Sequence, residues 1–146
     1  MSASTMSSVR SNTPWHVWVV GVLTVLWDGA GAYVIMMAQA GRLPDLTPDE
    51  IAYYTAQPLW FVVVTDVALL GAIAAGIALL LRSRHALGLF AISLVAIFVT
   101  NVYDLAMGTS RVFASRSALI ATCIIVVLAV LQLWYAMAMK KRAVLT

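Results

Sequence analysis

The sequence predicts an all-α fold, an up-down four-helix transmembrane bundle with a short interfacial helix in the outer loop between helices 1 and 2. Composition is the first observation behind this prediction, because 63% of the 146 residues are hydrophobic and only 10% are charged. Soluble domains usually carry about 25% charged residues. The second observation is a set of four apolar runs, each with the roughly 20 residues that a helix needs to cross a bilayer.

Each apolar run is expected to be a helix, because backbone polar groups inside a bilayer must be satisfied within the segment. The predicted spans are residues 15–37, 59–81, 86–107 and 118–139. The first run is too long for a signal-peptide core and no cleavage site follows promptly, so we expect it to be retained. Residues 1–14 are polar and Ser/Thr-rich and predict a disordered cytoplasmic tail, and residues 140–146 predict a basic one.

The basic residues predict the orientation. Six of them fall on one side of the bundle, namely Arg10, Arg82, Arg84, Lys140, Lys141 and Arg142. The other side receives only Arg42, Arg111 and Arg116. Because basic residues concentrate on the cytoplasmic side, both termini are expected to be cytoplasmic. Four tryptophans near the span ends are predicted membrane-interface anchors, namely Trp15, Trp18, Trp60 and Trp134.

The loop between the first two spans carries a helix-start signal. Thr47 at the N-cap, Pro48 at the first helical position and Glu50 at the third predict a capping box. The short helix would end near Pro58 and lie along the membrane surface. It could be a lid or docking surface, or a packed connector, and the connector is favoured because most loops only connect.

Asp28 lies in the middle of the first apolar run and is the strongest candidate for function. Residues three, four and seven apart share a helix face, and Asp28 shares its face with small or polar residues: Gly21, Thr24, Gly31, Ala32, Ile35 and Gln39. A charged carboxylate at this depth costs at least about 3 kcal/mol unless it is protonated, hydrogen-bonded, hydrated or cation-bound. A ligand, proton or cation site and a structural hydrogen bond between helices are equally favoured.

Other polar residues lie in the outer half of the spans. Asn101 and Asp104 share a face of the third span with Ser93 and Thr100. Asp66 lies opposite the small residues of the second span, where it could contact another chain. The candidate residues for binding a ligand, cation or proton are Asp28, Asp66, Asn101, Asp104, Thr24 and Thr100.

Several functional classes lack sequence support. No nucleophile elbow, Gly-rich phosphate loop or HExxH helix occurs, so no catalytic residues are expected. Paired haem ligation would need two intramembrane histidines, but only His16 lies within a predicted span, and His85 belongs to the basic inner loop. The carboxylates lack zinc-ligand spacing, so no cofactor or metal is expected. Cys123 is the single cysteine, which excludes an intramolecular disulfide. No basic patch with interleaved aromatics predicts nucleic-acid binding.

The chain resembles an uncharacterised family of small four-span proteobacterial inner-membrane proteins, some of which carry the label "sugar transporter". The residues that carry the resemblance are Trp27, Asp28, Gly31, Ala32, Tyr33, Met37, Gln39, Thr47, Pro48, Glu50, Tyr53, Tyr54, Pro58, Trp60 and the basic turn after Leu81. This chain has Val34 and Ile35 where relatives have an Asp-Tyr pair, so a site built on that pair would be altered here. The resemblance implies four spans in the inner (cytoplasmic) membrane of a bacterium.

The leading prediction is a non-catalytic small integral membrane protein that binds a partner, a second copy or a small molecule, with Asp28 as the central polar contact. The expected partners are therefore the lipid bilayer and either a homo-oligomer or a larger membrane complex. The alternative is a transporter or channel component with an outer-facing acidic site at Asp28, Asn101 and Asp104.

Overall fold

The computed structural model describes residues 14–107 and 116–142, without the side chains of 116–119. The described residues form five helices, listed in chain order as α1 (Trp15–Gln39), α2 (Pro48–Thr55), α3 (Leu59–Leu80), α4 (His85–Met107) and α5 (Arg116–Lys141). Four are long and apolar enough to span a membrane. The predicted four-helix transmembrane bundle and its short interlying helix are confirmed.

The bounds of the four long helices agree with the predicted spans to within two residues. α5 continues through Lys140 and Lys141, so these two residues are its last turn and not part of a tail. Basic side chains are favourable at this position, because they face the negative end of the helix dipole. The predicted N-terminal tail lies outside the described residues, apart from Pro14, and residues 143–146 also lie outside them.

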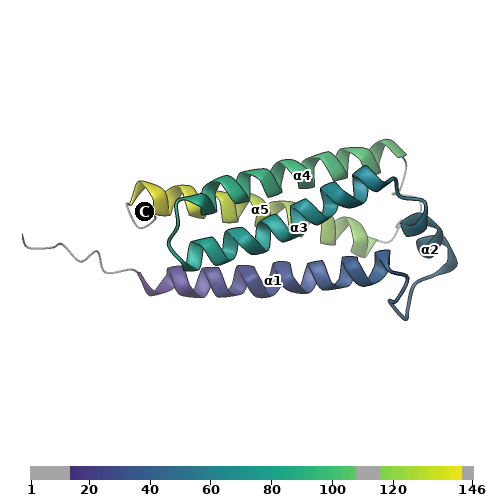
Figure 1. Cartoon of the computed structure of the whole chain (residues 1–146), viewed down its shortest axis with the longest axis horizontal. Coiled ribbons are helices and arrows are strands. Elements are labelled where there is room, and N and C mark those ends of the chain that lie inside the picture. The colour runs from purple at the N-terminus through teal and green to yellow at the C-terminus, as the bar shows by residue number, and fades with distance from the viewer. Residues whose placement is uncertain (1–13, 108–115, 143–146) are drawn as a thin grey trace, which may run out of the picture.

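The four long helices run side by side and antiparallel to their sequence neighbours (Figure 1). α1 begins and α5 finishes at the same end of the bundle, which we call the terminal end, and α2 lies at the opposite end, the α2 end. α3 packs most extensively against α4 and α1, and α5 packs against α4. Among the described residues, α1 and α5 do not form a close backbone contact of this kind.

Small residues bring α1 and α3 together toward the terminal end. A Cβ on Gly76 would lie 2.9 Å from the Cγ2 atoms of both Thr24 and Val25, and a Cβ on Gly21 would lie 2.5 Å from Cδ2 of Leu80. Lipid tails are as apolar as leucine, so close packing rather than exclusion from water drives helices together in a bilayer. The small-residue faces predicted for α1 and α3 therefore meet each other in this contact.

The contact between α3 and α4 includes a buried polar bond. The Ser93 hydroxyl donates to the backbone carbonyl of Ala68 at 2.6 Å, and both residues are buried. Ala75, Phe90 and Ala136 form a buried cluster that joins α3, α4 and α5. The alanines on α3 and α5 leave room for the ring of Phe90 on α4, so the three helices can approach closely.

Two helix ends adopt the left-handed turn of a Schellman motif. After α1, Gly41 has φ 65° and the amides of Gly41 and Arg42 donate to the carbonyls of Ala38 and Met37. After α3, Arg82 has φ 59°, and the amides of Arg82 and Ser83 donate to the carbonyls of Leu79 and Ala78. Only glycine adopts this conformation without a steric cost, so the turn at Arg82 is strained while the turn at Gly41 is not.

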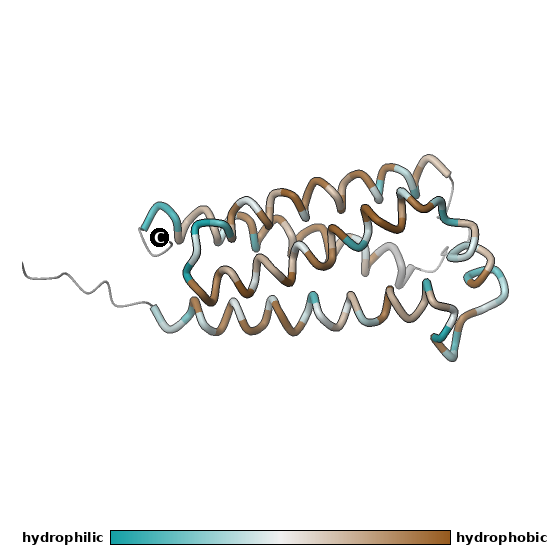
Figure 2. The backbone as a smooth tube through the Cα atoms, in the orientation of Figure 1, coloured by the Kyte–Doolittle hydropathy of each residue, from teal (hydrophilic) through white to brown (hydrophobic). Residues whose placement is uncertain are grey.

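Hydrophilic positions gather toward the two ends of the bundle, and the lengths of the long helices are mainly apolar (Figure 2). The four predicted interface tryptophans are exposed at the protein surface, namely Trp15, Trp18, Trp60 and Trp134. Exposed aromatic rings at span ends are typical of the membrane interface. The protein is therefore a small multi-pass integral membrane protein, with its apolar outer surface suited to contact with lipid.

Candidate functional site

Asp28 forms a hydrogen bond across the bundle to a residue that the sequence analysis passed over. The Gln132 side-chain amide, near the middle of α5, donates to Asp28 Oδ2 at 3.2 Å. Both side chains are partly buried. Each lies near the midpoint of a predicted span, so the Asp28–Gln132 pair is a polar contact inside the membrane region.

The Asp28–Gln132 pair retains two free acceptor atoms within the part of the chain that the structure describes. Asp28 accepts at Oδ2, and no hydrogen bond reaches its Oδ1 from a described residue. Gln132 donates through its amide nitrogen, and its Oε1 likewise has no donor among the described residues. A carboxylate oxygen and an amide oxygen can each accept from an incoming donor.

The structure also explains why these acceptors are not enclosed. α1 and α3 diverge from the terminal end toward the α2 end (Figure 1). Gly31 lies seven residues beyond Thr24, on nearly the same face of α1. A Cβ on Gly31 would meet nothing within 4 Å, whereas the space beside Thr24 is filled by Gly76 and its neighbours. α1 is thus closely packed against α3 beside Thr24 and has open space at Gly31.

The face of α5 that carries Gln132 is open in the same half of the bundle. Ala121 and Ile125 share this face by their spacing of eleven and seven residues from Gln132, and both are exposed. The residues of α1 and α5 beyond the Asp28–Gln132 pair, Gly31, Ala121 and Ile125, are therefore small or apolar and exposed.

α2 lies across the α2 end of the bundle. It contacts α1 through backbone packing, and on the other side the Tyr53 hydroxyl donates to Asp104 Oδ1 of α4 at 2.7 Å. The predicted capping box of Thr47 and Glu50 is confirmed, with both reciprocal bonds present. α2 is therefore a short helix fixed at its start by its cap and along its length by α1 and α4.

Burial and hydrogen bonding shift the acid–base behaviour of the α2 side chains. Burial, and then the hydrogen bond to Asp104, raise the pKa of Tyr53 well above its usual range. Burial and the nearby Glu50 charge raise the pKa of Tyr54. The bond from the Thr47 backbone amide lowers the pKa of Glu50. At neutral pH Tyr53 is therefore a protonated donor and Glu50 an ionised acceptor.

An aromatic cluster supports the same end of the bundle. The ring of Tyr103 on α4 lies 4.9 Å from the rings of both Trp60 and Phe61 on α3, edge-on to Trp60. Edge-to-face pairs at this distance are favourable. The cluster joins α3 to α4 next to the Asp104 position.

The other predicted site residues do not converge with Asp28. Thr100 and Asn101 both donate to the carbonyl of Ile97 on their own helix, at 3.0 and 2.7 Å. Thr24 is buried against Gly76. The acidic grouping of Asp28, Asn101 and Asp104 is thus divided among three different hydrogen-bond partners, on α5, α4 and α2.

Asp66 remains the least satisfied of the candidates. Its Oδ1 atom is buried and has no hydrogen-bond partner among the described residues. Asp66 itself is only partly buried, on a face of α3 that is not its buried small-residue face. Nothing in the described part of the chain brings another candidate residue to it.

His16 and Tyr135 make the second side-chain link between α1 and α5. The His16 Nδ1 atom and the Tyr135 hydroxyl share a hydrogen bond, and their rings meet edge-on at 5.9 Å. His16 is thereby a structural partner of Tyr135. In the described ranges, no group of three His, Cys, Asp or Glu side chains could hold a metal ion.

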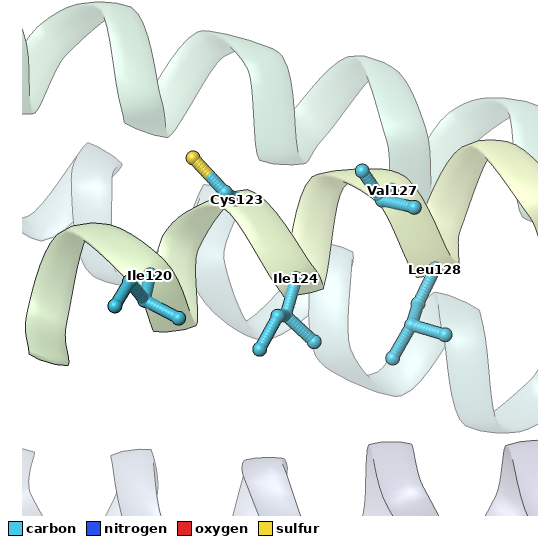
Figure 3. A pocket seen from close by; sticks show the side chains of 5 residues that line it. All are labelled: Ile120, Cys123, Ile124, Val127 and Leu128. Atoms are coloured by element: carbon cyan, nitrogen blue, oxygen red, sulfur yellow. The ribbon is translucent and has the colours of Figure 1, made fainter.

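A shallow apolar groove of about 380 Å³ runs along α5 and is lined by Ile120, Cys123, Ile124, Val127 and Leu128. Ile120, Ile124 and Leu128 point from α5 in the direction of α1, while Cys123 and Val127 lie on the side nearer α4 (Figure 3). The groove is lined by one helix and contains no hydrogen-bonding group apart from the thiol. A lipid acyl chain fits these properties, so the groove does not define a polar site.

Gln132 is the functional candidate that sequence reasoning missed. It is a polar residue in an apolar run, which is the signal that identified Asp28. It also lies three and four residues from Ala129 and Ala136, which are both buried. These two signals together could have placed it on an internal face.

Comparisons with known proteins give no match. No protein-family model, curated protein or solved structure is similar to this chain.

Proposed function

We propose that this protein is a non-catalytic small-molecule-binding protein of a bacterial inner membrane, with the Asp28–Gln132 pair as its central polar contact. The observation that carries the proposal is the pair of acceptors, Asp28 Oδ1 and Gln132 Oε1, that have no donor among the described residues. Unsatisfied polar atoms are costly inside a bilayer. A bound molecule with hydrogen-bond donors would remove that cost.

The distribution of basic residues supports an orientation with the terminal end in the cytoplasm. Arg82, Arg84 and the Lys140–Arg142 run lie at the terminal end, against Arg42 and Arg116 at the α2 end. The exposed residues Gly31, Ala121 and Ile125 would then lie between the Asp28–Gln132 pair and the outer face of the membrane. A ligand could reach the pair from outside the cell or from the outer leaflet.

A transport pathway through Asp28, Asn101 and Asp104 has weaker support. Such a pathway would need the three side chains to face one space, but Asn101 is bonded within α4 and Asp104 is bonded to α2. Binding at the Asp28–Gln132 pair requires no such convergence.

The test is native mass spectrometry of the protein extracted gently from its own membrane. Retention of a small-molecule adduct by the natural chain and by Asp66→Asn, with loss of the adduct in Asp28→Asn, is the expected result. Asp66→Asn is the matched control because it makes the same chemical change at another intramembrane carboxylate. A bare monomer would overturn the proposal, and a homo-oligomer or a heteromeric complex without an adduct would replace it with an assembly role.

A further inference from the structure

We infer that a groove between α3 and α4 binds an anionic phospholipid, with an acyl chain in the groove and the phosphate at Arg82 and Arg84 of the α3–α4 turn. The groove has a volume of about 470 Å³ and is lined by aliphatic side chains of both helices, among them Val64, Val67, Ala91, Ile92 and Val95. The Asp28–Gln132 pair is formed by the other two long helices. The inference therefore does not rest on the proposed function.

One face of α4 leads from the turn to the groove. Arg84, immediately before α4, lies seven residues from Ala91 and eleven from Val95, and these spacings place residues on one helix face. Gly88 lies between them on this face, and a Cβ there would meet nothing within 4 Å. The path along α4 from Arg84 to the groove is therefore not filled by a side chain at Gly88.

The depth of the groove matches the reach of an acyl chain. At a rise of about 1.5 Å per residue, the groove residues of α4 begin about 10 Å from Arg84. An acyl chain of one leaflet extends through about 15 Å, half of the hydrocarbon core. A lipid whose phosphate lies at Arg84 therefore extends its chain past Gly88 and into the groove.

The turn supplies positive charge that does not depend on pH in the physiological range. Arginine stays protonated there, and its planar donors bind phosphate through charge-assisted hydrogen bonds. The α3–α4 turn lies at the terminal end of the bundle (Figure 1). All six acidic side chains of the sequence belong to α1–α4 or to the segment between α1 and α2, and none of them lies in this turn.

The backbone of Arg82 indicates that its side chain has a use. Arg82 has φ 59°, whereas the equivalent position after α1 is Gly41 with φ 65°. Glycine adopts this left-handed conformation without the steric cost that a Cβ brings. The turn therefore accommodates an arginine at a local cost, and a bound phosphate offsets that cost.

The charge at the terminal end also decides between a lipid and a second copy of this chain as the occupant of the groove. A second copy in the same orientation would bring its own Arg82, Arg84 and Lys140–Arg142 run to the same level of the membrane. Like charges at close range repel, whereas the phosphate of a lipid is attracted. The lipid is therefore the occupant that fits both the apolar groove and its basic end.

Native mass spectrometry of the full chain in micelles tests the inference with two lipids that share the same acyl chains. Phosphatidylglycerol carries one negative charge, and phosphatidylcholine has no net charge. We expect the chain to retain one phosphatidylglycerol about tenfold more tightly than phosphatidylcholine, the scale of attraction between two basic side chains and an anionic headgroup. Equal retention of the two lipids would overturn the inference without depending on any variant.

Two charge variants locate the headgroup. Arg84→Gln should weaken phosphatidylglycerol binding severalfold and leave phosphatidylcholine binding unchanged. Lys140→Gln is the matched control, because it removes the same charge at the terminal end from α5, and it should weaken binding less. Equal losses in the two variants would show a general effect of surface charge and overturn the site.

Arg82→Gly separates binding from stability. Glycine relieves the left-handed turn, so the lipid-free variant should unfold at a higher temperature than the natural chain. The same variant should bind phosphatidylglycerol severalfold more weakly. Undiminished binding would overturn the assignment of the phosphate to this turn.

Gly88→Phe tests the path of the acyl chain. The ring should fill the open position between Arg84 and the groove and weaken the binding of both lipids. Gly29→Phe on α1 is the control, because Gly29 is also a helical glycine with nothing within 4 Å of its Cβ position. Equal lipid binding by the Gly88→Phe variant and the natural chain would overturn the groove as the site of the chain.

Discussion

The Tyr53 hydroxyl donates to Asp104 Oδ1 at 2.7 Å and thereby holds the short surface helix α2 against the end of α4. The two residues are far apart in the chain, and the bond joins a loop element to a membrane-spanning one. It makes α2 a packed connector across the α2 end of the bundle. The Ile51 side chain of α2 is 42% exposed.

Removing the Tyr53 hydroxyl should loosen α2. We expect Tyr53→Phe to lower the free energy of unfolding by about 1–2 kcal/mol, since it leaves a partly buried carboxylate without this donor. Hydrogen exchange should become faster across residues 48–55 and stay unchanged in α3. Tyr33→Phe is the control, because Tyr33 is 63% exposed. Unchanged exchange in α2 would show that the bond does not hold it.

The same bond should make the protein sensitive to alkali. The pKa of Tyr53 is raised above its ordinary value of 10.0, so the folded state holds this proton more tightly than the unfolded state does. The resulting stabilisation is fully present below pH 10 and is lost as the pH rises from there through the folded-state pKa. The tyrosinate absorbance of the natural chain minus that of Tyr53→Phe should appear only above pH 10. A difference spectrum that appears at or below that pH contradicts the prediction.

The cap of α2 should respond to acid. The pKa of Glu50 is lowered below its ordinary value of 4.5, so its bond to the Thr47 amide stabilises the helix above pH 4.5 and is lost as the pH falls through the folded-state pKa. Hydrogen exchange of the first turn of α2 should therefore become faster, relative to the other helices, as the pH falls through the folded-state pKa of Glu50. Glu50→Gln should remove this pH dependence, because an amide oxygen accepts the same bond at every pH.

The contact between α1 and α3 should not tolerate a methyl group on Gly76. A Cβ there meets two short β-branched side chains, Thr24 and Val25, at 2.9 Å. We expect Gly76→Ala to lower the free energy of unfolding by about 1–3 kcal/mol through overpacking. Gly29→Ala, with open space at its Cβ position, should be neutral or stabilising by up to about 1 kcal/mol. Unfolding in mixed micelles measures both, and equal effects would refute the close contact.

The link between His16 and Tyr135 should contribute to holding α5 against α1. We expect Tyr135→Phe to cost about 1 kcal/mol in the same unfolding assay, because the ring remains and only the hydroxyl is lost. Trp134→Phe changes a neighbouring ring that is 62% exposed and should cost less. If Trp134→Phe lowers the free energy of unfolding more than Tyr135→Phe does, Tyr135 is not on the face of α5 that contacts α1, and the prediction is wrong.

Sequence periodicity predicted the elements and their faces because these features are local. Apolar runs specify the four spans, Thr47 and Glu50 specify the start of α2, and the small residues of α3 lie at its buried face as expected. The partners of the polar side chains were not predictable in the same way. Whether Asp28 meets Gln132 depends on how α5 crosses the bundle.

The candidate site was also predictable only in part. Asp28 was identified from its depth in an apolar run, but its grouping with Asn101 and Asp104 rested on similar depth alone. Depth does not specify the direction in which a side chain points, and Asn101 instead donates to its own helix. The divergence of α1 and α3 toward the α2 end is likewise not encoded by any local pattern.

The order of helices along the chain has a consequence for how this protein is made. Asp28 emerges from the ribosome with α1, and α2 follows, but Gln132 arrives only after α3 and α4 have been synthesised. α1, α3 and α4 can assemble through contacts that need no residue of α5. During membrane insertion Asp28 is therefore left without its amide partner until α5 enters the bilayer, and the polar contact that joins the first and last helices forms only at that step.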